Sequence, residues 1–315
     1  MYPIGGYFEL ELHKGGHYHK GAIRLNTARN CFEYVLRARH YRKVFFPYYS
    51  CEVMLEPIKK LGVEYEFYHI NSSFEPIDLP SLKADEAFLY TNYFGLKQEC
   101  VLRLAKVYGK QLIVDNAQAF YAEPIQGIDT FYSARKFFGV PDGAYLYTEK
   151  RLEKELGQDV SFERMTHLLK RIDLGAEASY QDFRKNDDSL CNQEIKCMSR
   201  LTESLLSGID YEVAKQKRRE NFALLDNALR KSNLMHLEME DEMVPMVYPY
   251  LTENENIKQR LVDDKVFVAT YWANVMEWCD LDDVEYQLTQ KTVFLPIDQR
   301  YGKKEMKSIV EKLLR

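Results

Sequence analysis

The chain has 315 residues, of which 46% are hydrophobic and 29% are charged, and its formal net charge is −5. This composition is typical of a globular protein with one large core and a smaller second unit, and it excludes disordered and disulfide-scaffold classes. The negative charge argues against a nucleic-acid partner, and no apolar run is long enough to cross a membrane.

Helix-like and strand-like segments alternate from Thr27 to about Thr148. Apolar spacing predicts helices over 27–41, 50–62 and 100–109, the last two ended by Gly62 and Gly109. Short apolar runs predict strands over 43–46, 63–70, 86–93, 111–115, 129–133 and 143–148. Strands separated by helices indicate a mainly parallel sheet with helices on its faces.

The second half of the chain has a different character. Residues 149–231 are almost entirely compatible with long helices. Beyond Asn233 the pattern predicts strands over 243–251, 265–272 and 292–297 and helices over 255–263 and 303–315. We therefore expect a large α/β domain over residues 1–210 and a small α+β domain over residues 211–315.

In an open parallel sheet, ligands bind beyond the carboxyl ends of the strands, where loops lead into helices. The first such place is Leu25–Asn30, just before a predicted helix. Asn26 or Thr27 can cap this helix, and the free N–H groups of its first turn can bind a phosphate. A plain helix cap is the alternative.

The second place is the end of the strand over 111–115, where a carboxylate, Asp115, leaves a buried run. Such a carboxylate needs a cation or hydrogen-bond donors, and a protonated pyridine nitrogen is a suitable cation. Gln118, three residues on, can donate to a ring oxygen. Alternatively, Asp115 caps a short helix that begins at Asn116.

The third place is residues 132–143, in which Lys136 follows a strand and is surrounded by aromatic residues. A lysine near apolar groups can have a lowered pKa, so that its neutral amine forms an imine. An exposed loop lysine is the alternative.

Taken together and in this order, the three places resemble the fold type I enzymes that use pyridoxal 5′-phosphate (PLP), above all the DegT/DnrJ/StrS aminotransferase family. The resemblance spans most of the chain. It rests on the order and spacing of several segments, which are LNTARNCFEYVL, FPYYSCEVMLEPIKKLGVEYEFYHIN, TNYFG, VDNAQAF, SARK, KQKRRENFALLDNAL and TVFLPIDQRYGKKEMKSIVEKL.

This resemblance implies a sheet of the seven-stranded type and a set of PLP-binding residues. Lys136 would carry PLP as a Schiff base and move the proton between substrate and cofactor. Asp115 would pair with the ring nitrogen and Gln118 with the ring oxygen. The remaining cofactor contacts would come from Thr27, Ala28 and Ser133 at the phosphate and Asn92 near the ring.

The sequence also departs from the family. The stretch from Asp115 to Lys136 is short, and Ser133 lies closer to the lysine than usual, as in cysteine desulfurases. Cys51, with Tyr48 and Tyr49 nearby, stands where many members place the aromatic residue that stacks on the ring. A segment rich in Gly and His replaces the usual N-terminal helix.

Several other features receive a structural interpretation. His17 and His19 lack further ligands at metal-binding spacing, so we predict surface loop residues and no metal site. The basic run Lys215–Arg219 lies among acidic residues on a predicted helix and is expected to be a solvated face. The aromatic residues Tyr271 and Trp272 resemble small-domain residues that cover a substrate pocket.

The sequence thus predicts a PLP-dependent aminotransferase that moves an amino group from a donor, expected to be glutamate, to a keto substrate such as a nucleotide-linked keto-sugar. The resemblance implies a homodimer with shared active sites. Two alternatives stay open, a PLP-dependent lyase or desulfurase and a non-catalytic relative. Six cysteines without a CxxC pair and an N-terminus without signal-peptide features predict free thiols and a cytoplasmic location.

Overall fold

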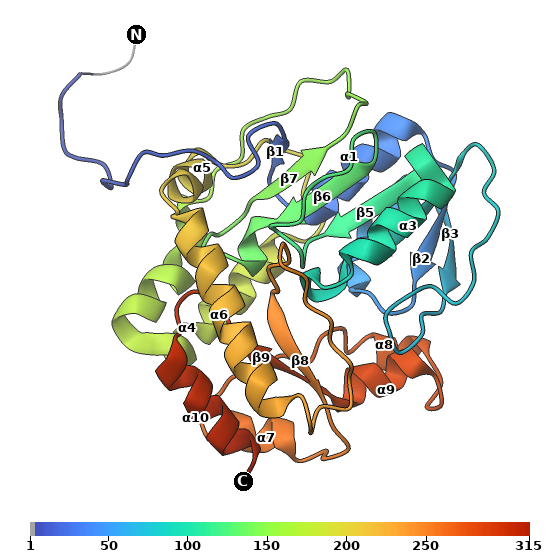
Figure 1. The fold of residues 1–315 in the computed structure, drawn as a ribbon. Coiled ribbons are helices and arrows are strands. Elements are labelled where there is room, and N and C mark those ends of the chain that lie inside the picture. Colours follow the sequence, from blue (N-terminus) through green and yellow to red (C-terminus); the bar gives the residue numbers. More distant parts are fainter. Residues whose placement is uncertain (1–3) are drawn as a thin grey trace.

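The computed structural model describes residues 4–315 as a large sheet flanked by helices, with a smaller two-stranded sheet beneath it (Figure 1). The strands of the large sheet are β1 (Ile23–Leu25), β2 (Lys43–Pro47), β3 (Glu64–Tyr68), β4 (Glu86–Thr91), β5 (Leu112–Asn116), β6 (Asp129–Ser133) and β7 (Ala144–Tyr147). Their spatial order is β1-β7-β6-β5-β4-β2-β3. Strands β3, β2, β4, β5 and β6 are parallel, and β7 runs antiparallel to both β6 and β1.

Helices cover both faces of this sheet, which explains why its central strands are apolar throughout. Strands β4, β5 and β6 are buried along their whole length. Along β4, Ala87 and Leu89 pack into one core and Phe88 and Tyr90 into the other, because neighbouring side chains of a strand point to opposite faces. The helices of this part are α1 (Ala28–Arg39), α2 (Leu55–Leu61) and α3 (Gln98–Tyr108).

The ends of these helices follow the sequence signals. Thr27 caps α1, and its side chain accepts a hydrogen bond from the Asn30 N–H. Gly62 ends α2 with φ 65°, a left-handed conformation that favours glycine, and Gly109 ends α3. The predicted helix ends at Gly62 and Gly109 are therefore confirmed.

The second half of the chain holds the long helices and the small sheet. The helices are α4 (Thr166–Ser189), α5 (Arg200–Ser207), α6 (Tyr211–Leu229), α7 (Ile257–Asp263), α8 (Val275–Trp278), α9 (Val284–Lys291) and α10 (Lys303–Leu313). Strands β8 (Val247–Leu251) and β9 (Thr292–Pro296) pair antiparallel. Helix α6 contacts both β8 and α10, so one continuous core joins the small sheet to a face of the large one. No helix among the described residues is long and apolar enough to cross a membrane.

Two secondary-structure predictions are wrong. Residues 265–272 make only one bridge, from Ala269 to Phe294, because Lys265 (φ 64°) and Trp272 (φ 59°) turn the backbone out of the extended conformation at both ends. Residues 149–161 are not helical. Their backbone pairs instead with the segment around Cys197, as in the hydrogen bond from the Asp159 N–H to the Cys197 carbonyl (3.0 Å). Such long-range pairing overrides local helix propensity.

The two N-terminal histidines are not surface residues, which corrects the prediction for them. His19 is 1% exposed and its Nε2 lies 2.8 Å from the Phe120 carbonyl. Burial lowers the pKa of His19 to about 4, so the ring is neutral at neutral pH. The His17 Nδ1 lies 2.7 Å from the Tyr145 hydroxyl. Both rings fasten the N-terminal segment to the sheet through aromatic neighbours.

The basic run of α6 is only partly a solvated face. Arg218, in the middle of the run, is 2% exposed. Its guanidinium donates to the Met246 carbonyl (2.9 Å) and to the Gln299 Oε1 (3.0 Å) and lies 4.5 Å from the centre of the Phe137 ring. These contacts come from segments far away in the sequence, so the charge pattern of the helix alone could not reveal them.

Candidate active site

A cavity of about 170 Å³ lies at the carboxyl ends of the parallel strands. Its walls come from the turn before α1, the segment after β2 and the ends of β4, β5 and β6. The structure brings most of the predicted site residues together here, namely Thr27, Ala28, Asp115, Gln118, Ser133, Lys136 and Trp272. This is the edge at which ligands of open α/β sheets bind.

Asp115 is a buried carboxylate near the end of β5. It is 6% exposed, and one oxygen accepts a hydrogen bond from the Ala117 N–H at 2.8 Å. Burial raises the pKa of Asp115 to about 6, although the nearby positive charge of Lys136 partly opposes this shift. An ionised Asp115 would therefore be stabilised by a cation placed in the cavity.

Gln118 presents a hydrogen-bond donor that the protein does not use. Its Oε1 accepts from the Phe94 N–H at 3.1 Å, whereas its Nε2 is buried and has no partner among residues 4–315. The neighbouring Thr91 hydroxyl, also in the cavity wall, is buried and without a partner among these residues as well. Buried polar groups are nearly always hydrogen-bonded, so this part of the cavity fits a ligand that carries an acceptor.

The turn before α1 offers backbone donors, while its threonine hydroxyl is engaged. The Thr27 hydroxyl accepts from the Asn30 N–H (3.1 Å) and donates to the Asn30 Oδ1 (2.6 Å), so it acts as a helix cap. Within the described chain, the N–H groups of Ala28 and Arg29 make no hydrogen bond. Two free N–H groups at the start of a twelve-residue helix favour an anion.

Lys136 lies at the end of a short 3₁₀ helix, η4 (Ala134–Lys136), that directly follows β6. Its side chain is exposed but lines the cavity, and its charge lowers the pKa of both Asp115 and Cys51 against the effect of burial. The Lys136 Nζ is 5.8 Å from the centre of the Tyr271 ring. The lysine amine and the buried carboxylate thus act on the same small space.

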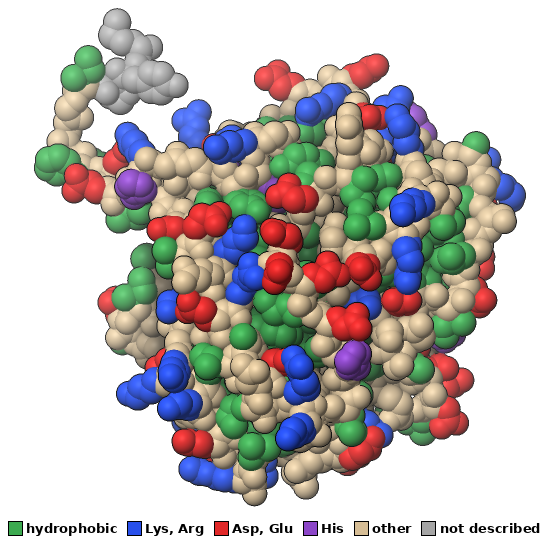
Figure 2. All heavy atoms as spheres, in the orientation of Figure 1, with side chains coloured by type: hydrophobic (Ala, Val, Ile, Leu, Met, Phe, Trp, Pro, Cys, Tyr) green, Lys and Arg blue, Asp and Glu red, His purple; other side chains and the backbone are tan. Residues whose placement is uncertain are grey.

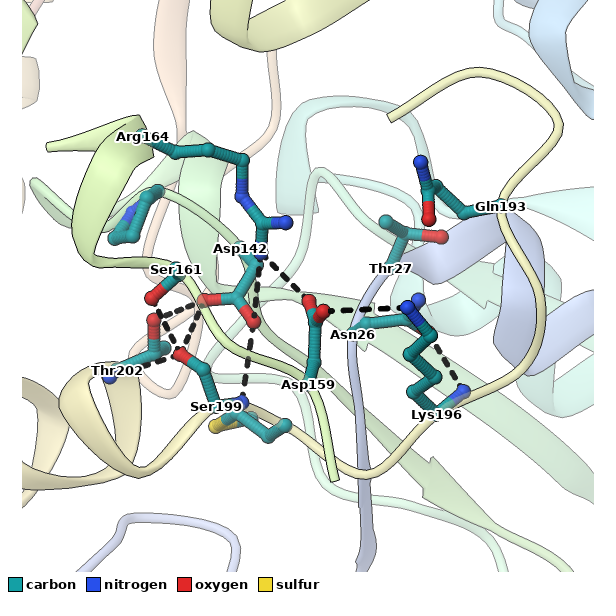
Figure 3. A network of polar contacts seen from close by, with 12 residues as sticks. Asn26, Thr27, Asp142, Asp159, Ser161, Arg164, Gln193, Lys196, Ser199 and Thr202 are labelled. Carbon is teal, nitrogen blue, oxygen red and sulfur yellow. Dashed lines mark hydrogen bonds and ion pairs between the residues drawn. The ribbon is translucent and has the colours of Figure 1, made fainter. Parts of the chain in front are cut away.

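A buried polar network joins the loop that contains Lys136 (residues 132–143) to the turn before α1 (Figure 3). The Gly143 N–H donates to the Asn26 carbonyl at 2.6 Å, and Asn26 is in turn bonded to Lys196 and Glu194. The carboxylate of Asp142 accepts from the N–H and hydroxyl of Ser199 (3.1 and 3.0 Å) and from the Thr202 hydroxyl. The segment before α5 therefore fixes both loops at once.

Two predicted positions, Asn92 and Tyr271, lie outside the cavity wall. Asn92 does not line the cavity, because its side chain bonds to Gln98 (2.9 Å) and to the Lys97 N–H (3.0 Å) at the start of α3. Tyr271 packs on Phe294 outside the cavity wall, with ring centres 4.5 Å apart. Trp272, expected at the substrate, is the aromatic side chain that lines the cavity itself.

The structure also adds residues that the sequence did not single out. Arg29 and Arg135 line the cavity, and each is held by a carboxylate: Arg29 by Glu56 (2.8 Å) and Arg135 by Asp187 (2.9 Å). Both arginines directly adjoin predicted residues, Arg135 next to Lys136 and Arg29 next to Ala28. That proximity to a predicted anion site was the signal that could have identified them.

Comparisons with known proteins bear on this site. No family model and no curated protein matches the sequence. Solved structures do match, each over 93% of this chain. A sugar aminotransferase from Micromonospora echinospora has 15% identity and a TM-score of 0.63 over 86% of its own chain. A DegT/DnrJ/EryC1/StrS aminotransferase from Brucella abortus has 13% identity and a TM-score of 0.62 over 85% of its chain.

A third match, from Streptococcus pneumoniae, is provisionally assigned as a sugar aminotransferase and was solved in a PLP form. It has 14% identity and a TM-score of 0.65 over 86% of its chain. Identities this low establish a shared fold. The chain therefore has the fold of the DegT/DnrJ/StrS aminotransferases, which confirms the predicted fold class.

Proposed function

We propose that this protein is a PLP-dependent aminotransferase in which Lys136 carries the cofactor. The observation that supports the proposal most strongly is the convergence of four complementary groups on one cavity. These are the Lys136 amine, the buried Asp115 carboxylate, the unpartnered Nε2 of Gln118 and the free N–H groups at the start of α1. The shared fold supports the same conclusion.

The residues present fit this cofactor. When bound, PLP supplies a cationic ring that withdraws electrons from the substrate carbon. Asp115 would hold a proton on the ring nitrogen, and the buried carboxylate would in return gain the cation that it lacks. Gln118 would donate from Nε2 to the ring oxygen. The N–H groups of Ala28 and Arg29, together with the Ser133 hydroxyl of the same cavity wall, would bind the phosphate.

Lys136 would act twice in the reaction. Its Nζ would first anchor the cofactor and, once displaced by the amine of the donor, would move a proton between the reacting carbons. Trp272, in the cavity wall, would cover the ring and exclude water.

The likeness to sugar aminotransferases supports a sugar as one of the substrates. We propose glutamate as the amino donor and a nucleotide-linked keto-sugar as the acceptor, used in alternating half-reactions. We also propose two domains, over residues 1–210 and 211–315, and a cytoplasmic homodimer whose subunits complete each other's sites. The proximity of Ser133 to Lys136 keeps the lyase or desulfurase reaction as the second candidate.

The test is a visible spectrum of the protein after addition of PLP, beside that of Lys136→Ala. We expect a lysine-bound PLP band in the wild type, borohydride trapping on Lys136, and neither in the variant. Glutamate should then bleach the band and release 2-oxoglutarate.

Three results would speak against the proposal in different ways. A colourless wild type would refute the cofactor, and an unchanged band in Lys136→Ala would refute its anchor. A band that no amino donor bleaches would favour the lyase or desulfurase reaction.

A further inference from the structure

A second cavity, of about 730 Å³, shares Arg135 and Lys136 with the 170 Å³ cavity at the strand ends. We call the larger one the α4 cavity and the smaller one the cofactor cavity. Its other walls come from α4, from the loop after η4, from Arg218 on α6 and from residues 298–300 after β9. Helix α4 lies beside α6 and α10 in Figure 1, on the flank away from β3. The reacting amine therefore opens both onto the small cofactor cavity and onto a much larger space.

The charge of this large cavity is strongly positive. Five cationic side chains line it, and the one acidic residue is Asp298; the cations are Arg135, Lys136, Arg171, Arg218 and Arg300. Burial lowers the pKa of the histidine in the wall, His167, and so favours its neutral form. The whole chain has a net charge of −5, and acidic and basic side chains are interspersed on the face drawn in Figure 2. A local excess of cations in such a chain favours an anionic ligand.

The arginines differ in how far they are already neutralised. Arg300 forms two hydrogen bonds to the carboxylate of Asp298, at 2.7 and 2.9 Å, and Arg135 is paired with Asp187. Arg171 is exposed and has no ion pair with any residue of the described chain, although the adjacent Lys170 is paired with Asp182 at 2.7 Å. Arg218 also forms no ion pair within the described chain, but it is 2% exposed and its guanidinium is engaged with the Met246 carbonyl and Gln299. Arg171 is therefore the exposed arginine of the cavity whose charge is free to meet a ligand.

A kink in α4 shapes the cavity around Arg171. Gly175 interrupts the helix with φ 83° and ψ −177°, a conformation open essentially to glycine alone. Leu168, Arg171 and Ile172 from the first half and Tyr180 and Phe183 from the second half line the same cavity. The kink lets the two halves enclose one space with basic and aromatic walls.

The basic wall continues outward. Arg171 and Arg300 also line a neighbouring cavity of about 710 Å³, together with Lys265 and Lys312. Ligand pockets of about 300–1,000 Å³ accommodate drug-sized molecules, so each cavity exceeds what an amino-acid donor needs. The space suits the larger of the two proposed substrates.

We infer that the α4 cavity binds the acceptor through a phosphate or diphosphate group and that Arg171 is the residue that selects for this group. The inference rests on the proposed function, because the acceptor must reach Lys136. A guanidinium offers paired donors that match phosphate oxygens, and such charge-assisted hydrogen bonds are among the stronger ones in proteins.

The test measures binding rather than turnover. PLP is first fixed on Lys136 with borohydride, and inorganic pyrophosphate is then titrated calorimetrically into the wild type, Arg171→Gln and Lys170→Gln. We expect Arg171→Gln to raise the Kd about tenfold, equivalent to about 1.4 kcal/mol. Lys170→Gln removes the same charge from the next residue of α4, outside the cavity wall, and should change the Kd by less than about twofold.

Two further arms make the result decisive. Arg171→Lys keeps the charge and should give an intermediate Kd. Glutarate, which mimics the donor, should bind with a Kd that Arg171→Gln does not change; a selective effect on glutarate would reassign Arg171 to the donor. Equal effects of the glutamine variants at 170 and 171, or no binding of pyrophosphate to the wild type, would overturn the inference.

Failure of the inference and failure of the proposed function remain distinguishable. A lysine-bound PLP band with no Arg171 effect would overturn the anion site alone. If no band forms, the same titrations on the untreated protein still decide whether Arg171 binds pyrophosphate.

Discussion

The two cavities that meet at Lys136 are built in different ways. The small one is formed by the ends of parallel strands, and its polar groups are buried and partly unpartnered, as in Asp115 and Gln118. The large one is formed by a kinked helix and the small-sheet region, and its cations are partly exposed. Under the proposed function, the sheet would supply the reacting groups of the site and helix α4 would shape the space through which a substrate reaches them.

The two cavities also differ in how their residues affect the stability of the protein. Burying a carboxylate without a cation destabilises the protein, and this cost is the kind that functional sites carry. The α4 cavity depends instead on a backbone conformation at Gly175 that glycine adopts readily and other residues do not. We therefore expect loss of the Asp115 carboxylate to stabilise the protein and replacement of Gly175 to destabilise it, although both changes weaken function.

The largest effect is expected from Asp115→Asn in the cofactor cavity. The glutamate half-reaction should slow by about a hundredfold or more, because the ring nitrogen loses its partner. The cofactor-free protein should become more stable at pH 8 by up to about 3 kcal/mol, since a pKa raised from 3.8 to about 6 means that burial opposes ionisation. Denaturant titrations and stopped-flow absorbance measure the two effects.

The effect of Asp115 on the free energy of unfolding should change with pH. In the cofactor-free wild type, the contribution of Asp115 is fully present below about pH 4 and is lost as the pH rises through about 6, because only the folded state holds the carboxyl protonated in that range. Asp115→Asn should abolish this loss. Asp78→Asn, at an exposed position, serves as the control, and equal pH profiles for both variants would contradict the prediction.

An intermediate effect is expected from Gly175→Ala in the α4 cavity. Alanine disfavours φ 83°. The free energy of unfolding of the variant should therefore fall by about 1–3 kcal/mol, or the helix should straighten. Either outcome reshapes the cavity, and pyrophosphate binding should weaken while the lysine-bound PLP band stays. Gly157→Ala, which meets no atom within 4 Å, is the control. Loss of the PLP band in Gly175→Ala would show that the two cavities are not independent.

The smallest effect is expected from Thr27→Ala at the start of α1. Loss of the helix cap should lower the free energy of unfolding by about 1 kcal/mol. The affinity for PLP should fall by less than about threefold, because the hydroxyl is engaged with Asn30 and the backbone N–H groups remain. Thr27→Ser should restore stability. A large loss of PLP affinity at unchanged stability would assign the hydroxyl to the phosphate instead.

Local sequence patterns predicted the parts of the fold that depend on local physics. The alternation of helices and strands up to residue 148, the cap at Thr27 and the helix ends at Gly62 and Gly109 follow from periodicity and from preferences of single residues. The strand-end rule then placed Asp115, Gln118 and Lys136 at one edge of the sheet.

Contacts between distant segments decided the rest. The backbone of residues 157–159 pairs with the segment around Cys197 and is not helical, and residues 265–272 form one bridge where a strand was expected. The buried His19 and Arg218 bond to carbonyl groups 28 to 101 residues away in the sequence, in segments that only folding brings near.

The sequence by itself determined the order of the elements and the identity of the residues at the strand ends, because strand and helix periodicities are local and parallel strands place their carboxyl ends at one edge. Only the tertiary structure decided which charges are buried and which are free. It paired Arg135 with Asp187 and Arg300 with Asp298, and it buried Arg218. It left Arg171 without an ion pair among the described residues and placed Lys136 in the wall of the α4 cavity. The physical reason is that the environment of a charge depends on every segment packed around it.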